Sequence, residues 1–164
     1  MGEHHPAASP EEAQALAERV ALAMYARDRA SQALGMHIVR VGAGHAELSM
    51  RVRADMLNGH LTCHGGFIFS LADSAFAFAC NSYNLTTVAS GCTIEFVAPA
   101  RENDVLTAVA QERSVSGRTG VYDIEVSNQG GAAIAFFRGK SYRVKGHVLD
   151  GADGPPRRAP AGGD

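Results

Sequence analysis

The sequence is poor in cysteine, has no excess of basic residues and contains no long apolar run, and each shortage excludes a class of protein. The three cysteines are odd in number and form no CxxC pair, which indicates reduced thiols rather than a disulfide framework. A formal net charge of −2 provides no basic surface for nucleic acid. No apolar stretch reaches the roughly 18 residues of a membrane span, and the N-terminus lacks the basic and apolar segments of a signal peptide. We therefore expect a cytoplasmic protein that binds neither nucleic acid nor membranes.

The length and composition are those of one ordinary globular domain. The chain has 164 residues, of which 46% are hydrophobic and 20% charged, enough to build a core. We place a single domain at residues 9–147. Residues 1–8 are expected to form a flexible N-terminus. Residues 148–164, rich in Gly, Pro, Asp and Arg, are expected to form a disordered tail.

Helix and strand signals divide the domain into two helical segments and a series of strands. The run SPEE at residues 9–12 has the pattern of a capping box with Pro at the first helical position, and predicts a helix to about Ser31 with Gly35 as a stop. A second helix is predicted over residues 66–80, after an irregular loop at 54–63. Strands are predicted at residues 37–41, 45–53, 87–98, 104–113, 119–128 and 132–145.

Short links between long consecutive strands favour an antiparallel sheet, and the run NQGG at residues 128–131 is typical of a hairpin turn. The central helix is apolar on all sides, so the sheet is expected to curl around it. The predicted fold is therefore α+β, with an additional N-terminal helix. A curled sheet leaves an edge strand free to pair, which favours a homodimer.

The central helix carries an isolated acid, Asp73, within its apolar sequence. The few other polar residues of this helix are Ser70, Ser74 and Asn81, and their spacing places them with Asp73 on one stripe. An ordinary interpretation is that this stripe meets solvent and that Asp73 has an ion-pair partner. The alternative is a catalytic carboxylate, whose pKa desolvation would raise.

The residues just before the helix favour the catalytic interpretation. Asn58 supplies an amide, and His64 precedes Gly65 and Gly66 at the helix start. Without Cβ atoms, these glycines leave backbone N–H groups open at the positive end of the helix dipole, where a carbonyl oxygen gaining negative charge could bind. Alternatively, the glycines only allow a tight turn.

Gly65 and Asp73 are too far apart to act together within one helix. They are separated by eight residues, or roughly 12 Å at 1.5 Å per residue. The N–H group that polarises a carbonyl and the carboxylate that attacks it, or directs water to it, must lie within a few ångström of the same carbon. If both act, Gly65 of one chain must face Asp73 of a second chain, with two sites per dimer.

At this point a family resemblance is apparent. The run MLNGHLTCHGGFIFSLADSAFAFACNS, residues 56–82, resembles the motif of the hotdog-fold acyl-CoA thioesterases, most closely their phenylacetate-degradation (PaaI) branch. The likeness continues through VASGCTIEFVAPA, GRTGVYDIEVSNQ and AFFRGKSYR and covers roughly residues 20–147. It implies a hotdog fold, dimers stacked into a homotetramer, and hydrolysis of acyl-CoA thioesters without a metal or other cofactor.

The resemblance also implies roles for individual residues. It places the acid on Asp73, the carbonyl-polarising N–H on Gly65 and the orienting amide on Asn58, and it has His64 hold the thioester or the loop. A neighbouring branch uses Glu as the acid and a hydroxyl residue one turn later. Here that later residue is Ala77, which leaves Ser74 as the nearby hydroxyl.

Substrate contacts are expected from three groups of residues. Gly66 and Ser74 adjoin the catalytic positions. Four of the seven Phe lie on the central helix, and one or two of them, Phe67 included, could flank an aryl group such as (hydroxy)phenylacetyl, which would place the enzyme in aromatic catabolism. The CoA phosphates need cations, and the resemblance suggests the run RGKS: Arg138, Gly139, Lys140 and Ser141. Equally, these charges could simply protect a strand edge.

Several alternatives remain open on the sequence. A hotdog-fold enoyl-CoA hydratase or dehydratase would share the fold but release no thiol, and a non-catalytic acyl-CoA-binding protein would bind without turnover. Cys63 and His64 could form a thiolate–imidazole pair. His60, Cys63 and His64 could suggest zinc, but no second ligand pair accompanies them. Asp73 would be unexplained in a non-catalytic protein and by the Cys63–His64 pair.

Overall fold

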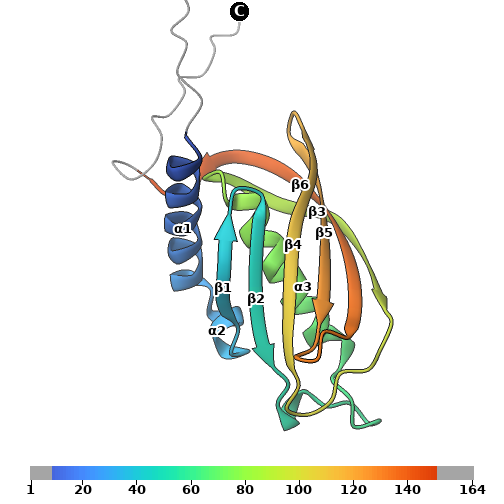
Figure 1. Cartoon of the computed structure of the whole chain (residues 1–164). Coiled ribbons are helices and arrows are strands. Elements are labelled where there is room, and N and C mark those ends of the chain that lie inside the picture. The colour runs from blue at the N-terminus through green and yellow to red at the C-terminus, as the bar shows by residue number, and fades with distance from the viewer. Residues whose placement is uncertain (1–8, 151–164) are drawn as a thin grey trace, which may run out of the picture.

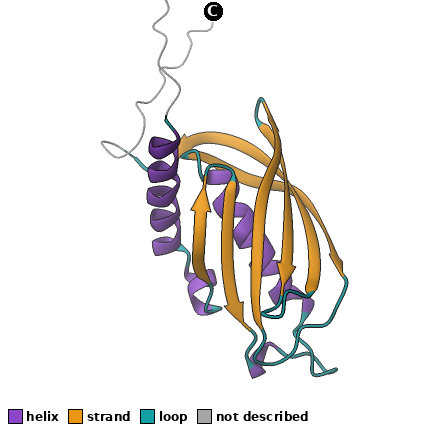
Figure 2. Ribbon diagram, viewed as in Figure 1, coloured by secondary structure: helices purple, strands orange, loops and turns teal. Residues whose placement is uncertain are grey.

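The computed structural model describes residues 9–150, and within them the predicted architecture is confirmed. Six antiparallel strands form one sheet in the order β1-β2-β4-β5-β6-β3, which curls around helix α3 (Figures 1 and 2). The helices are α1 (Pro10–Arg27), α2 (Arg29–Ala33), a 3-10 turn (Ala54–Met56) and α3 (Gly65–Asn81). The strands are β1 (His37–Gly42), β2 (His45–Arg51), β3 (Leu85–Phe96), β4 (Val105–Ser116), β5 (Thr119–Ser127) and β6 (Ala133–His147).

The N-terminal helix begins where the sequence predicts but breaks earlier than expected. The capping box is present: Ser9 accepts a hydrogen bond from the backbone of Glu12, and the Glu12 side chain accepts one from the backbone of Ser9. The predicted single helix is interrupted at Asp28, whose backbone is not helical. The Asp28 carboxylate accepts hydrogen bonds from the backbone N–H and hydroxyl of Ser31, so this residue caps the short second helix.

Alternating side chains explain why the sheet wraps around α3. In β4, Leu106, Ala108 and Ala110 point inward and are fully buried, while the residues between them are more exposed. Small inward residues let the sheet approach α3 closely. The predicted hairpin joins β5 to β6, where Asn128 Oδ1 accepts hydrogen bonds from the backbones of Gly130 and Ala132.

Strand β3 lies at an edge of the sheet, hydrogen-bonded to β6 on one side only. Near its two ends it carries exposed apolar side chains, with Val88 47% and Phe96 51% accessible. An unpaired edge with apolar side chains favours pairing with another strand.

The two ends of the domain lie close to the predicted boundaries. Strand β6 continues to His147, and two residues assigned to the tail are held in place: Val148 O accepts a hydrogen bond from Arg27, and Leu149 N donates one to Asn84. The expected flexible segments at 1–8 and beyond 150 lie outside the described residues. No helix within residues 9–150 is long and apolar enough to cross a membrane.

Gly139, in β6, is constrained by packing against α3. A Cβ built on Gly139 would lie 2.8 Å from two ring atoms of Phe76, a buried side chain that cannot readily move. We expect Gly139→Ala to lower the free energy of unfolding by about 1–3 kcal/mol, measured by urea denaturation. The matched control is Gly91→Ala in the neighbouring β3, where a new Cβ meets nothing within 4 Å. Equal stability of the two variants would contradict this packing account.

Candidate functional site

The start of α3 presents one open backbone donor. His64 is the N-cap, and its Nδ1 accepts a hydrogen bond from Gly66 N at 3.1 Å, while its carbonyl accepts one from Phe67 N at 2.9 Å. The N–H of Gly65 has no hydrogen-bond acceptor among residues 9–150. Of the two glycine donors predicted at this helix end, the structure therefore leaves Gly65 available and ties Gly66 to the cap.

The loop before α3 is fixed by hydrogen bonds that also involve Asn58. Its Oδ1 accepts from the backbones of His60 and Thr62, and its Nδ2 donates to the Thr62 hydroxyl. Backbone bonds from Cys63 to Ala100 and from His64 to Met56, both 2.8 Å, anchor the helix start. Within one chain Asn58 thus organises the loop, and a direct contact with substrate stays a prediction.

Asp73 is half-buried in the middle of α3, and its side chain makes no hydrogen bond or ion pair within the described part of the chain. Burial raises the pKa of its carboxyl above the ordinary value, as the sequence predicts. The same apolar surroundings, with a smaller contribution from the Asp73 charge, raise the pKa of the buried Cys80 thiol to about 12. An unpaired, partly desolvated carboxylate is suited to accepting a proton.

The other polar side chains of the predicted stripe make hydrogen bonds within the chain. The Ser74 hydroxyl lies 3.0 Å from that of Ser31 in α2, which joins the two helices. Asn81 exchanges two hydrogen bonds with the backbone of Thr87 in β3. Ser70 donates to the backbone of Gly66. Asp73 is therefore the one residue of this group whose side-chain polar atoms are left free by the rest of the described chain.

A hollow of about 410 Å³ lies beside Gly65. Its lining is mostly apolar: Thr62, Cys63, Gly65, Ile68, Phe96, Val97, Ala98 and Pro99. The Phe96 ring packs against Gly65, since a Cβ there would lie 3.0 Å from the ring. The sequence did not predict a role for Phe96, because this residue of β3 is brought to the start of α3 only by the curvature of the sheet.

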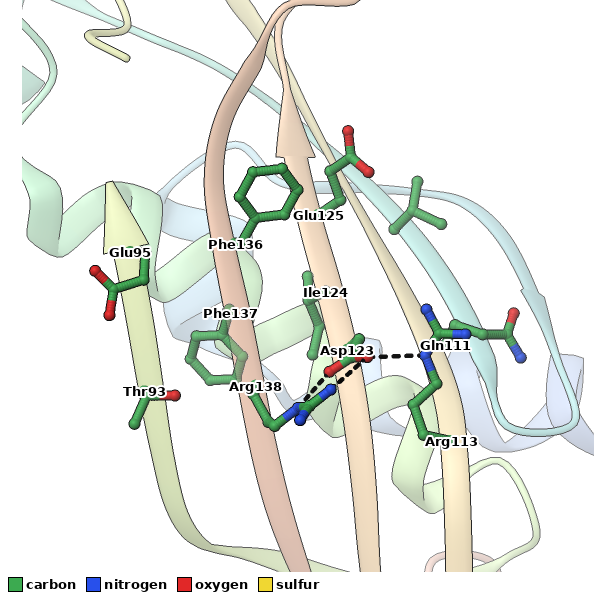
Figure 3. Close-up of a pocket in the computed structure, with 11 residues that line it drawn as sticks. Thr93, Glu95, Gln111, Arg113, Asp123, Ile124, Glu125, Phe136, Phe137 and Arg138 are labelled. Atoms are coloured by element: carbon green, nitrogen blue, oxygen red, sulfur yellow. Dashed lines mark hydrogen bonds and ion pairs between the residues drawn. The ribbon is translucent and has the colours of Figure 1, made fainter. Parts of the chain in front are cut away.

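The run RGKS does not form one surface. Gly139 and Ser141 are buried toward α3, whereas Arg138 and Lys140 point away from it on the outer face of the sheet. There Arg138 donates two hydrogen bonds to Asp123, at 2.6 and 2.9 Å, and Arg113 donates a third to the same carboxylate (Figure 3). These bonds lower the pKa of Asp123. Arg113, Asp123 and Arg138 line an outer groove of about 580 Å³.

The cysteine and metal alternatives find no support in the geometry. Cys63 is buried, its thiol faces the carbonyl of His64, and burial raises its pKa to about 11, which disfavours a thiolate. All three cysteines are free. Among residues 9–150 no cluster of three or more His, Cys, Asp or Glu could hold a metal ion.

The N-cap role of His64 leads to a specific prediction. His64→Leu removes the acceptor for Gly66 N and is expected to lower the free energy of unfolding by about 1 kcal/mol. His64→Asn is the matched control, because Asn is a preferred N-cap and can accept the same bond. We expect the Asn variant to retain more stability and more activity than the Leu variant. Indistinguishable urea-unfolding curves would refute the capping role.

Comparison with known proteins shows similarity to thioesterases. Residues 60–135 match the model of the thioesterase superfamily. The chain is 53% identical over 126 residues to the acyl-coenzyme A thioesterase PaaI of Escherichia coli K12, covering 77% of this chain and 90% of that protein.

Solved structures agree as well. The E. coli PaaI protein from the phenylacetic acid degradation operon superposes with a TM-score of 0.81 at 51% identity, covering 82% of this chain and 97% of that one. A variant of the phenylacetic acid degradation protein PaaI from Thermus thermophilus gives a TM-score of 0.69 at 38% identity, covering 71% and 100%. The protein therefore belongs to the PaaI family of hotdog-fold acyl-CoA thioesterases.

Proposed function

We propose that the protein hydrolyses aryl-acyl-CoA thioesters, such as phenylacetyl-CoA or a hydroxylated relative, to the free acid and CoA. The observation that carries this proposal is the half-buried, unpartnered Asp73 carboxylate on the same helix whose first residue offers a free N–H. The PaaI relatives, named for acyl-CoA thioester hydrolysis and phenylacetic acid degradation, support the substrate class.

Asp73 can act as a general base or as a nucleophile. As a base, it takes a proton from water while the water oxygen attacks the thioester carbonyl carbon. The Gly65 N–H donates to the resulting oxyanion. Collapse of the tetrahedral intermediate breaks the C–S bond, and the departing CoA sulfur receives the proton from Asp73. As a nucleophile, the Asp73 carboxylate attacks the thioester carbon, and the C–S bond breaks to release CoA as a thiolate and leave a mixed anhydride. Water then hydrolyses the anhydride to the free acid and the Asp73 carboxylate, and the proton released in this step goes to the CoA thiolate. Neither route requires a metal or another cofactor.

Two chains are needed for this chemistry. Gly65 and Asp73 belong to one continuous helix, so the spacing of roughly 12 Å between them persists in the folded chain. The free edge of β3 supports pairing of two sheets beside their central helices. We propose that Gly65 of one protomer and Asp73 of its partner complete each site.

The contacts to the rest of the substrate follow from this arrangement. We propose that Lys140, which makes no ion pair among residues 9–150, binds a CoA phosphate from the substrate of a neighbouring subunit. Arg138 is occupied by Asp123 within its own chain, so its contribution requires that ion pair to open. Gly139 and Ser141 then act by shaping the strand, and Gly66, Ser74 and Phe67 by shaping the helix start and its packing.

A tetramer and a cytoplasmic location complete the proposal. The outer sheet face carries the exposed Phe136 beside the groove of Figure 3, and we propose that two dimers meet there. The free thiols support a reducing compartment. Sedimentation equilibrium should give a tetramer for the wild type and a dimer for Phe136→Asp, and a wild-type dimer would disprove the tetramer.

A free-thiol assay tests the activity. Purified protein is incubated with phenylacetyl-CoA, hexanoyl-CoA and a trans-2-enoyl-CoA, and CoA release is followed with a thiol reagent. We expect the highest kcat/KM with the aryl substrate. Loss of the enoyl chromophore without thiol release would instead indicate a hydratase. Binding without any turnover would indicate a non-catalytic protein.

A further inference from the structure

A row of aromatic rings crosses the interface between α3 and the sheet. Phe69 contacts Phe137 edge to face, with ring centroids 5.4 Å apart, and Phe137 contacts Phe76 at 6.0 Å. Phe76 in turn contacts Tyr122 at 5.5 Å. The last three rings are buried, whereas Phe69 is half-buried at the end of the row. Phe69 therefore has one ring surface supported by the core and another left open.

Helix geometry places the open ring next to Asp73. At about 100° per residue, Phe69 projects about 40° from the direction of Asp73 and lies one turn toward the helix start. Phe76 projects about 60° away on the same side, but its ring is only 1% accessible. Of the four phenylalanines of α3, Phe69 is thus the one with accessible surface that the helical repeat places closest to the direction of the carboxylate.

The two remaining helix phenylalanines point elsewhere. Phe67 and Phe78 project about 120° and 140° from the direction of Asp73. The Phe67 ring packs edge to face against His64, with centroids 6.4 Å apart, and Phe78 is buried. Phe67 therefore belongs to the packing of the helix start, although the sequence favours it as a substrate contact.

We propose that Phe69 is a specificity-determining residue, whose open ring surface forms a wall of the acyl pocket and favours aryl over alkyl acyl groups. The proposal rests on the proposed thioesterase function and adds the residue that selects the acyl group. Contact between two aromatic rings contributes more than the apolar area that it buries, and Phe137 holds the Phe69 ring in a fixed orientation. An alkyl chain in the same pocket would gain only the free energy of burying apolar surface.

The test compares Phe69→Leu with the wild type on phenylacetyl-CoA and hexanoyl-CoA. Leu keeps an apolar side chain but removes the ring. We expect the ratio of the two kcat/KM values, aryl over alkyl, to fall by about three- to tenfold, mainly through the aryl substrate. Tyr142→Leu is the matched control, because it also removes a ring, from an exposed side chain of β6 that has no role in the proposed site, and its ratio should stay at the wild-type value. Phe69→Tyr keeps a ring and should keep the preference.

The outcomes separate this inference from the proposed function. An unchanged ratio in Phe69→Leu, with thiol release intact, would overturn the role of Phe69 and leave the thioesterase function standing. A fall of the aryl-over-alkyl ratio in Phe67→Leu but not in Phe69→Leu would assign the selectivity to Phe67 at the helix start, and it would also overturn the role of Phe69. Absence of thiol release by the wild type would refute the function itself. If Phe69→Leu fails to fold, Phe69→Met provides the same comparison with a more adaptable side chain.

Discussion

Replacing Asp73 by Asn is expected to lower kcat for phenylacetyl-CoA by about 100-fold or more, because general-base catalysis typically contributes 10²–10⁴-fold. Asn has the same shape but cannot take a proton from water or form an anhydride. The carboxylate has no partner within residues 9–150, so its replacement breaks no hydrogen bond or ion pair there and the fold should be preserved. Steady-state kinetics together with a thermal unfolding curve measure both effects.

The control for this variant is Asp55→Asn, the same chemical change in an exposed ion pair with Arg53. An exposed pair contributes little to stability, so this variant should resemble the wild type in both assays. Retention of more than a few per cent of wild-type kcat by Asp73→Asn would show that another group performs the chemistry.

The raised pKa of Asp73 also fixes the sign of a pH effect on stability. A carboxyl whose pKa is higher in the folded than in the unfolded chain binds more protons when folded, so its contribution to stability falls as pH rises through the two pKa values. The wild type should therefore lose stability relative to Asp73→Asn as pH rises from below about 4 toward neutrality. Differential unfolding of the two proteins across this range measures the effect, and a constant difference would contradict it.

Mixing two inactive variants is expected to restore about a quarter of wild-type activity. Gly65→Pro removes the backbone N–H at the first helical position, where Pro is well tolerated, and the extended backbone of His64 is compatible with a following Pro. Asp73→Asn removes the carboxylate. Random pairing of equal amounts makes about half of all dimers hybrid, and each hybrid has one complete site, formed by Gly65 of the Asn variant and Asp73 of the Pro variant.

The controls separate loss of the N–H from the added side-chain atoms. Gly65→Ala introduces the Cβ that approaches Phe96 but keeps the N–H, so it should be far more active than Gly65→Pro, whose loss should be about 100-fold or greater. Each variant refolded alone should stay inactive. If the mixture is as inactive as its components, the two groups do not meet across a dimer interface.

Local signals in the sequence predicted most of the secondary structure. The capping box at Ser9, the apolar helix around Asp73 and the antiparallel sheet are confirmed, since each depends on neighbouring residues or on simple periodicity. The break at Asp28 was not predicted. The break occurs because the Asp28 side chain caps α2. A side chain that hydrogen-bonds to the nearby backbone competes with continuation of the first helix, and the sequence does not show which of the two is more stable.

Contacts between distant segments could not be predicted in the same way. The sequence grouped Ser74 and Asn81 with Asp73, but their partners lie on α2 and β3 and are brought near only when the sheet curls. Likewise, nothing near Arg138 in the sequence indicates that Asp123 holds it. The choice between Phe67 and Phe69 also required the positions of His64 and Phe137.

By itself the sequence determined that an acid would lie within an apolar helix, that two glycines would lie at the start of that helix, and that the helical repeat would keep the acid and the glycines about two turns apart. These conclusions need only the helical repeat and the identity of nearby residues. The tertiary structure decided which polar side chains make hydrogen bonds within the fold and which remain without a partner. The reason is that contacts between segments far apart in the chain depend on the curvature and register of the sheet.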